Sequence, residues 1–253
     1  MIPCAVPKTH AGIVNYDCPA PLKIELDRPE RFVIALVGMD FEARIAAGPG
    51  VLVICRNTEN GVASSLALAI KRGYRCLISF GVAGGLAPHL RPGDWIVASL
   101  IIDAQRKCPT DQIWSKKLLE MIPGAGYAPI AGVDAAITAP GAKRRMHEET
   151  GAAAVDMESH HVARLAPAHG LSFAAVRVVL DPAHRAVPEA ALAGMLPSGG
   201  TSVTAVMRKL IARPSQLSAL LRIAIDAYAA RGAMLRVRQL LGPGFGLLDL
   251  SDF

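Results

Sequence analysis

The stretch AAAVDMESHHVARLAPAHGLSFAAVRVVLD, residues 152–181, decides the fold of this chain. Its spacing predicts a short strand over 153–155, a helix over 157–169 and a buried strand over 173–180 that is rich in β-branched residues. This order of strand, helix and strand is typical of an α/β sheet. In an open α/β sheet, ligands are held beyond the carboxyl ends of the strands.

Two acidic residues of this stretch lie at strand ends. Glu158 lies where the first strand gives way to the helix, and Asp181 ends the second strand. The helix dipole alone favours a Glu in the first turn of a helix, and an Asp before proline commonly forms a turn. Each acid taken singly therefore has a structural explanation. Their combination predicts two carboxylates that face one pocket.

The composition indicates one catalytic domain in a reducing compartment. The chain has 253 residues and 52% hydrophobic content, enough for one large α/β core with a helical appendage. Its five cysteines show no CxxC spacing, so neither a disulfide framework nor a zinc site is expected, and the histidines show no metal-binding pattern. With no membrane-length apolar run and no signal peptide, we expect a cytoplasmic protein without a bound metal.

The excess positive charge is local. The net charge is +6, and residues 205–242 alone contain seven basic residues and one acidic residue. Leu217, Leu221, Ile225 and Tyr228 belong to an apolar stripe within this region. Packing on the domain explains the stripe most simply. The alternatives are an apolar entrance for a lipid-linked substrate and peripheral contact of residues 205–242 with an anionic inner membrane; nucleic acid is disfavoured because only one aromatic residue is present.

The remaining segments fit the same α/β organisation. The pattern predicts strands over 31–39, 51–55, 76–79 and 95–99, helices over 40–44, 61–72, 143–149, 188–196 and 202–211, a glycine-rich turn over 80–86, a loop over 104–114, and a longer helix capped by Ser215. Residues 1–30 contain five prolines and are expected to form an irregular extension.

Two motifs carry a family resemblance. Residues 81–99, GVAGGLAPHLRPGDWIVAS, and the series VDME, a strand with Arg177, then LDPAH, resemble the nucleoside phosphorylase and nucleosidase superfamily over about residues 31–184. The resemblance implies a three-layer αβα sandwich with a central mixed sheet over 31–187. Residues 188–253 would form a C-terminal helical extension packed on the same domain. It also implies a homodimer.

The same resemblance implies roles in cleaving a purine N-glycosidic bond. Asp181 corresponds to the acid that protonates N7 of the base, and Glu158 to the carboxylate that binds the ribose hydroxyls and faces the developing positive charge. Glu42 corresponds to the acid that activates water in nucleosidases, although a helix-dipole partner is its simplest reading from the sequence alone. The substrate-binding residues would be Met157, Gly81, Val82, Ala83, Ala135, Ala136, Ile137 and His184.

Hydrolysis is favoured over phosphorolysis. Bacterial phosphorylases of the superfamily place arginines at the positions of Glu42 and Ser79, because a phosphate nucleophile must be held by cations. The possible phosphate ligands in this chain are Arg44, Arg56 and Arg177. No cofactor is expected, only water or inorganic phosphate as co-substrate.

Two further segments resemble one branch of the superfamily. DFEAR at 40–44 and VLDPA at 179–183 are similar to segments of the hopanoid-associated phosphorylases, to which release of adenine from adenosylhopane, giving ribosylhopane, is assigned. The chain departs from the wider superfamily at Leu180, where a serine is usual, and at Ala136, where an aromatic residue usually stacks on the base. The alternatives are a methylthioadenosine or adenosylhomocysteine nucleosidase, a purine nucleoside phosphorylase and a non-catalytic nucleoside-binding protein.

Overall fold

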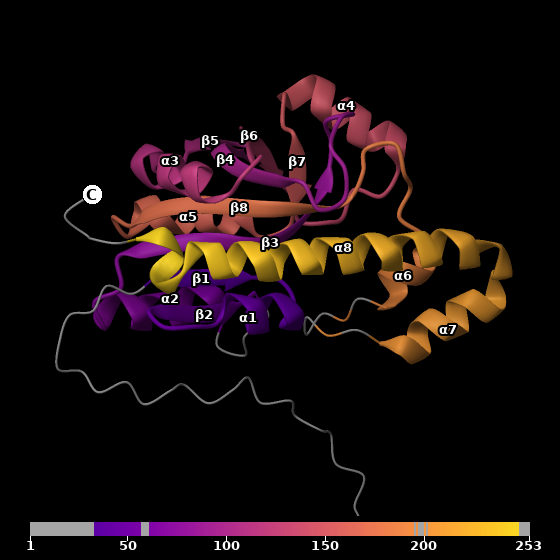
Figure 1. The fold of residues 1–253 in the computed structure, drawn as a ribbon, viewed down its shortest axis with the longest axis horizontal. Coiled ribbons are helices and arrows are strands. Elements are labelled where there is room, and N and C mark those ends of the chain that lie inside the picture. Colours follow the sequence, from indigo (N-terminus) through magenta and orange to yellow (C-terminus); the bar gives the residue numbers. More distant parts are fainter. Residues whose placement is uncertain (1–32, 57–60, 195, 197–199, 201, 248–253) are drawn as a thin grey trace, which may run out of the picture.

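The computed structural model describes residues 33–56, 61–194, 196, 200 and 202–247 (Figure 1). The strands are β1 (Val33–Val37), β2 (Val51–Cys55), β3 (Cys76–Gly85), β4 (Trp95–Ile102), β5 (Lys107–Pro109), β6 (Gly126–Gly132), β7 (Ala154–Asp156) and β8 (Ser172–Asp181). The helices are α1 (Asp40–Ala46), α2 (Gly61–Lys71), α3 (Gln112–Met121), α4 (Pro140–Thr150), α5 (Ser159–Ala168), α6 (Glu189–Gly194), α7 (Val203–Ala212) and α8 (Leu217–Leu241). The 3-10 turns η1 (Pro214–Gln216) and η2 (Pro243–Gly246) flank α8. The extension predicted over residues 1–30 lies outside the described residues.

One mixed sheet contains all eight of these strands. β1 lies between β2 and β3 and is parallel to both. The long β3 also pairs with β8 in parallel and with β7 in antiparallel orientation. Since β8 pairs with β4, β4 with β6 and β6 with β7, five strands close into a ring. The sheet is therefore partly closed, whereas the pattern of residues 152–181 suggested an open one.

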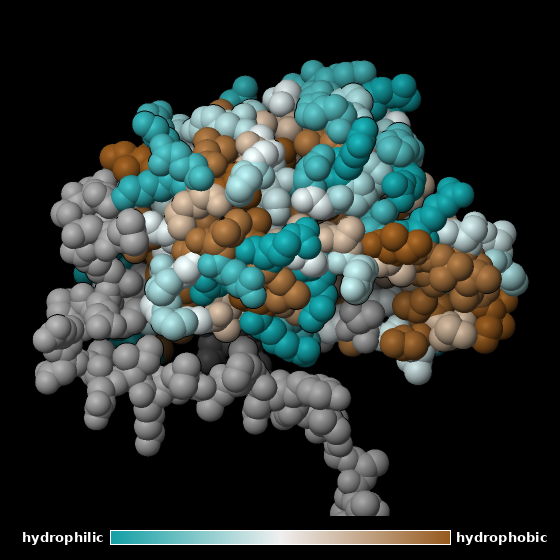
Figure 2. Space-filling model, in the orientation of Figure 1, coloured by the Kyte–Doolittle hydropathy of each residue, from teal (hydrophilic) through white to brown (hydrophobic). Residues whose placement is uncertain are grey.

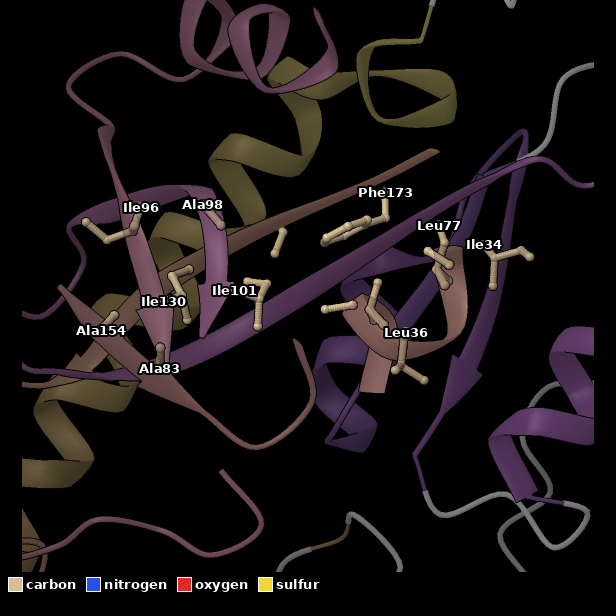
Figure 3. Close-up of a cluster of buried hydrophobic side chains, with 14 of the residues drawn as sticks. Ile34, Leu36, Leu77, Ala83, Ile96, Ala98, Ile101, Ile130, Ala154 and Phe173 are labelled. Atoms are coloured by element: carbon tan, nitrogen blue, oxygen red, sulfur yellow. The ribbon is translucent and has the colours of Figure 1, made fainter. Parts of the chain in front are cut away.

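Helices cover both faces of the sheet, which confirms the predicted three-layer αβα architecture (Figure 1). Successive residues of a strand point to opposite faces. In β1, Ile34 and Leu36 pack with α2 and α5, whereas Val33 and Val37 pack with α1, α3 and α8. Figure 3 shows part of the first of these two cores, with Phe173 of β8 among its members. Burying each large side chain of this kind contributes roughly 1.5–3 kcal/mol.

The glycine-rich segment over 80–86 is largely strand, which corrects the predicted turn. β3 continues without interruption to Gly85. Gly81 lies opposite Arg177 in the register of β3 and β8, and a Cβ atom at residue 81 would overlap Arg177 and Glu42. A glycine within a strand indicates that other groups approach the backbone closely. At Gly81 these groups are the Arg177 and Glu42 side chains.

The loop predicted over 104–114 is also corrected. β5 pairs with the end of β4, and α3 begins at Gln112. The Asp111 carboxylate caps α3 by accepting a hydrogen bond of 3.0 Å from the Trp114 backbone N–H. The Trp114 side chain is fully buried and donates its indole N–H to the Phe245 carbonyl at 3.1 Å. The polar residues that suggested a loop belong to a strand at the sheet edge and a helix cap.

The C-terminal helices form two parts. The second half of α8 packs on the sheet through Ala230, Met234 and Val237. α6, α7 and the first half of α8 extend past the edge of the sheet (Figure 1). Ser215 lies in η1 and does not cap the long helix, because α8 begins after Gln216. None of the helices among the described residues is both long and apolar enough to span a bilayer.

Candidate active site

Arg177 lies at the centre of the candidate site, fully buried in β8. Its Nε forms an ion pair with Asp156, and its Nη2 donates to Ser79 Oγ at 2.5 Å and lies 3.5 Å from Glu158 Oε2. Burial alone would lower the pKa of Arg177, but the carboxylates of Asp156, Glu158 and Glu42 raise it above its ordinary value. The guanidinium therefore stays charged and fixes the positions of the acids around it.

Glu42 is held in α1 with its carboxylate turned into the protein. Its Oε2 accepts hydrogen bonds of 2.9 Å from the Gly38 and Met39 N–H groups, and its Oε1 accepts one of 2.8 Å from Val82 N–H. Burial raises the pKa of Glu42, while Arg177 and these three N–H groups act in the opposite direction. The net effect is a pKa above the ordinary value. A buried carboxylate of this kind is a stronger base than one in water.

Glu158 is the residue immediately before α5, and it faces Arg177 from the end of β7. Burial raises the pKa of Glu158 to about 7, although Arg177 and Arg56 lower it. The Arg56 Nη1 atom lies 3.6 Å from Glu158 Oε1 and donates to the Met157 carbonyl at 3.4 Å. Gly38 leaves room for this carboxylate, because a Cβ atom at residue 38 would overlap it.

Asp181 is paired with a residue that the sequence did not point to. Lys143 of α4 is fully buried, and its Nζ forms an ion pair with Asp181 Oδ2. The same ammonium donates to the carbonyls of Pro182 at 3.1 Å and Arg185 at 3.2 Å. Burial raises the pKa of Asp181 above its ordinary value, and Lys143 opposes this effect. A single lysine in the first half of a short helix carries no motif, so only the tertiary structure reveals the pair.

Asp156 is a second residue to which the sequence gave no role. Its carboxylate forms an ion pair with Arg177. At the start of α5 it also accepts hydrogen bonds from the Ser159 hydroxyl and, at 3.2 Å, from the Ser159 backbone N–H. Asp156 therefore links the helix that carries Glu158 to the buried guanidinium. Its place in VDME, between a strand and a helix, was the available signal.

The acids occupy two adjoining positions along β3 and β8. Gly81 of β3 lies beside Arg177 and Glu42, and Gly84 lies beside Asp181. Gly84 is three residues further along β3 than Gly81, so the two positions are roughly 10 Å apart. Asp181 lines a cavity of about 210 Å³ together with Ser218, Arg222 and Asp226 of α8 and Arg185. Another cavity, of about 320 Å³, lies on the side of Arg56 and His161.

The other predicted substrate-binding residues are less clearly part of the site formed by the buried acids. Met157 is half-buried between Asp156 and Glu158, Ala83 is buried in β3, and the Val82 N–H is occupied by Glu42. Ala135 and Ala136 are exposed in the segment after β6, where Ile137 is half-buried. His184 is exposed, and Lys143 and Arg185 occupy the surroundings of Asp181 in its place.

The three candidate phosphate ligands do not form one cationic site. Arg44 is exposed on α1, and two residues apart on a helix point to different sides, so it does not join Glu42. Arg177 is surrounded by carboxylates, and Arg56 lies beside Glu158. Around Gly81 three carboxylates therefore meet two arginines, and this balance disfavours a phosphate anion.

One group of possible metal ligands is present among the described residues. Asp134, His160 and His161 each place a ligand atom within 4.8 Å of the others. The His160 Nε2 is already 3.0 Å from the Asp134 carboxylate, and burial, with the charges of Arg56 and Arg164 contributing, lowers the pKa of His161. Neighbouring cations make this a poor site for a metal ion.

Comparison with known proteins defines the class of this protein. The family described as the Phosphorylase superfamily matches residues 38–218, which is more than half of the chain. The chain therefore belongs to this superfamily, and it is an enzyme of the class that cleaves N-glycosidic bonds of nucleosides. Comparison with curated protein sequences finds no match.

Solved structures share the fold at low sequence identity. A 5'-methylthioadenosine/S-adenosyl homocysteine nucleosidase of Helicobacter pylori is 13% identical, with a TM-score of 0.59 over 85% of this chain and 97% of that one. The corresponding nucleosidase of Campylobacter jejuni is 16% identical, with a TM-score of 0.56 over 83% and 98%. The futalosine hydrolase of H. pylori is 15% identical, with a TM-score of 0.55 over 83% and 97%. At these identities the likeness supports the fold.

Proposed function

We propose that this enzyme hydrolyses the N-glycosidic bond of a purine nucleoside whose 5' substituent is a lipid, releasing adenine from adenosylhopane to give ribosylhopane. The observation that carries the hydrolytic reaction is the buried cluster in which Glu42, Asp156 and Glu158 surround Arg177. An excess of carboxylate suits a reaction that develops positive charge on a sugar. It opposes the entry of an anionic nucleophile.

The roles follow from the positions of the groups. Asp181 donates a proton to N7 of the departing base, so the electrons of the breaking bond are accepted by a neutral leaving group. Lys143 orients the Asp181 carboxyl group and stabilises the carboxylate left after proton transfer, because its ammonium contacts the carboxylate. Glu158 in its ionised form stabilises the sugar cation and binds the ribose hydroxyls. Glu42 takes a proton from water as the water oxygen bonds to the anomeric carbon.

Arg177 has a role in placing the water. Its buried Nη1 has no hydrogen-bond partner among the described residues. This atom and Glu42 Oε1 both lie over Gly81. A donor and a base directed to the same point are what an attacking water or a ribose hydroxyl requires. Phosphorolysis remains the alternative reaction, with Arg56 as its best placed cation.

The lipid-linked substrate is supported by two features. The segments DFEAR and VLDPA are similar to the hopanoid-associated branch. The cavity at Asp181 has the first half of α8 as one wall, and this helix presents apolar side chains on its outer side. The second candidate is a nucleosidase for methylthioadenosine or adenosylhomocysteine, the substrates named for two of the solved structures with this fold.

The experiment is adenine release by the purified enzyme from adenosylhopane in detergent and from methylthioadenosine in parallel. We expect faster release from adenosylhopane. Rapid release from methylthioadenosine with none from adenosylhopane would contradict the lipid substrate and favour the second candidate. The variant Asp181→Asn is expected to bind substrate and to lose turnover by roughly 10²–10⁴-fold. Unchanged turnover would remove Asp181 from the mechanism.

A further inference from the structure

α7 and the first half of α8 carry large apolar side chains on their outer surfaces. On α7 the exposed residues Val203, Met207 and Ile211 are 69%, 48% and 76% accessible. On α8, Leu221, Ile225 and Tyr228 are 57%, 68% and 79% accessible. Each set repeats every three or four residues and so forms a stripe along its helix. We call these six residues the α7–α8 patch. Figure 2 shows apolar surface gathered over these helices at one end of the molecule.

Basic side chains accompany the patch. Arg208 and Lys209 are exposed on α7, whereas Arg222 of α8 lines the cavity of Asp181. Arg213 pairs with Glu189, and Asp226 pairs with Arg185, so no acidic side chain of α7 or α8 remains unpaired. Apolar stripes beside unpaired cations are the surface that binds an anionic lipid bilayer, since the apolar side chains enter the acyl region and the cations meet lipid phosphates.

We propose that the α7–α8 patch docks this enzyme on the surface of an anionic membrane. A second copy of the chain fits the patch less well. A two-fold contact would place Arg208 and Lys209 of both copies in one interface to which α7 and α8 bring no unpaired acidic side chain, and the like charges would repel. A contiguous apolar surface that faces water favours aggregation. Such a surface is therefore expected where a partner covers it.

The docking surface is smaller than the basic region over 205–242. In the second half of α8, Ala233, Met234 and Val237 are buried against the sheet. Arg238 donates to the Ala46 carbonyl at 3.0 Å and also to the Gly242 carbonyl, and its guanidinium lies 4.6 Å from the centre of the Phe245 ring. These groups are already used within the fold. Membrane contact therefore belongs to residues 203–228.

The patch lies next to the catalytic acid, and this consequence rests on the proposed function. Ser218, Arg222 and Asp226 of α8 line the cavity of Asp181, and Leu221, Ile225 and Tyr228 are exposed on the adjoining face of the same helix. A bilayer in contact with that face would lie within one helix diameter of the cavity, roughly 10 Å. A lipid-linked nucleoside could then reach Asp181 while its lipid part stays close to the membrane.

The test measures sedimentation of the full chain with vesicles of phosphatidylglycerol and phosphatidylcholine, against vesicles of phosphatidylcholine alone. The patch variant is Ile211→Ser, Leu221→Ser, Ile225→Ser. The matched control is Leu68→Ser, Ile113→Ser, Leu240→Ser, whose side chains are 51%, 53% and 52% exposed outside the patch. A charge variant, Arg208→Gln with Lys209→Gln, tests the electrostatic part.

We expect binding to the anionic vesicles that weakens with salt, a loss of at least about tenfold in the patch variant and the charge variant, and none in the control. Equal binding by patch variant and control would overturn the proposal. The proposal would also be overturned if the chain did not bind the vesicles and instead formed a dimer, seen by analytical ultracentrifugation, that the patch variant cannot form. Vesicle binding is read without substrate, so it stands apart from failure of the proposed reaction. Far-UV circular dichroism and the midpoint of urea unfolding show that each variant is folded.

Discussion

At the scale of single residues, the site is organised by one guanidinium. Arg177 lies on the same face of β8 as the apolar residues Phe173, Ala175 and Val179, so a charged side chain stands among apolar ones. An unpaired charge at this depth would cost several kcal/mol. The ion pair with Asp156 and the approach of Glu158 offset that cost. The acids are thereby fixed before substrate binds.

The first prediction concerns Lys143. Lys143→Met keeps most of the side-chain volume and removes the ammonium that contacts Asp181. Lys143 lowers the pKa of Asp181, so without the ammonium the Asp181 carboxyl group keeps its proton to higher pH. We therefore expect kcat to fall, because the carboxylate left after proton transfer loses its partner, and the basic limb of the pH profile of kcat/KM to move to higher pH. If Lys143 has only a packing role, activity will fall by the same factor at every pH.

The second prediction concerns Arg56 and the pKa of Glu158, which lies at about 7. Glu158 must be ionised to stabilise the sugar cation, so kcat/KM should rise as the pH rises through about 7. Arg56 lowers the pKa of Glu158, so in Arg56→Gln the acidic limb should move to higher pH. Arg44→Gln is the matched control, because Arg44 is exposed on α1. An unmoved limb in Arg56→Gln would show that another group sets it.

The third prediction concerns Gly81. The Cβ atom of Gly81→Ala would overlap Arg177 and Glu42, and Arg177 is fixed by its other partners. We expect a large loss of kcat/KM and a loss of stability of about 1–3 kcal/mol by chemical denaturation. Gly84→Ala, three residues further along β3, meets no atom closer than 3.4 Å and should lose much less of both. Equal losses in the two variants would argue against the close packing at Gly81.

The residues of the site were predictable to different degrees. Glu158 and Asp181 were proposed because they lie in short motifs at strand ends, whereas Glu42 was proposed only from the family resemblance. Lys143 was missed because it reaches Asp181 from a helix 38 residues earlier in the chain. His184 was included because it is near Asp181 in sequence, yet it is exposed. Sequence distance is a poor guide where the chain turns sharply after a strand.

At the scale of secondary structure elements, the site depends on close contacts between backbones. α5 begins beside the end of β6, where Gly132 leaves no space for a side chain. A Cβ atom at residue 132 would be 2.5 Å from His160 Cβ and 2.9 Å from the His160 backbone nitrogen. This packing sets the position of the helix that follows Glu158.

The fourth prediction tests that packing. Because Gly132→Ala presses on backbone that cannot rotate away, we expect a loss of about 1–3 kcal/mol in the free energy of unfolding, measured in urea. Gly141→Ala is the control, since it lies in the first turn of α4 and its nearest atom would be 3.8 Å away. That variant should be as stable as the parent or more stable. A stable Gly132→Ala protein would show that α5 can shift.

Most elements were predictable because their periodicity is strong, as in β1, β8 and α2. The predictions were wrong where the local composition is typical of a turn or loop but the segment forms a strand or helix. The glycines of β3 suggested a turn, but a strand tolerates glycine where neighbouring side chains fill the space. α3 was missed because the polar residues before it suggested a loop, although Trp114, Leu118 and Ile122 recur at the helical spacing of four residues and are buried.

At the scale of the whole molecule, a partly closed sheet brings the ends of β1, β7 and β8 to one region, and a helical extension closes its side. The family resemblance predicted the three layers, but the ring of five strands depends on long-range pairings that no local pattern records. The extension carries the outer surface proposed for membrane contact. Chemistry and docking are thus assigned to adjoining faces of α8.

The central claim is that the carboxylate cluster around Arg177 directs water to the sugar. The most direct test is the rate of adenine release from whichever of adenosylhopane and methylthioadenosine is turned over, measured with and without inorganic phosphate, with identification of the sugar product. We predict the same rate in both conditions and a product that carries a free anomeric hydroxyl. Release that requires phosphate and yields a ribosyl phosphate would contradict the account, as would the absence of adenine from both substrates.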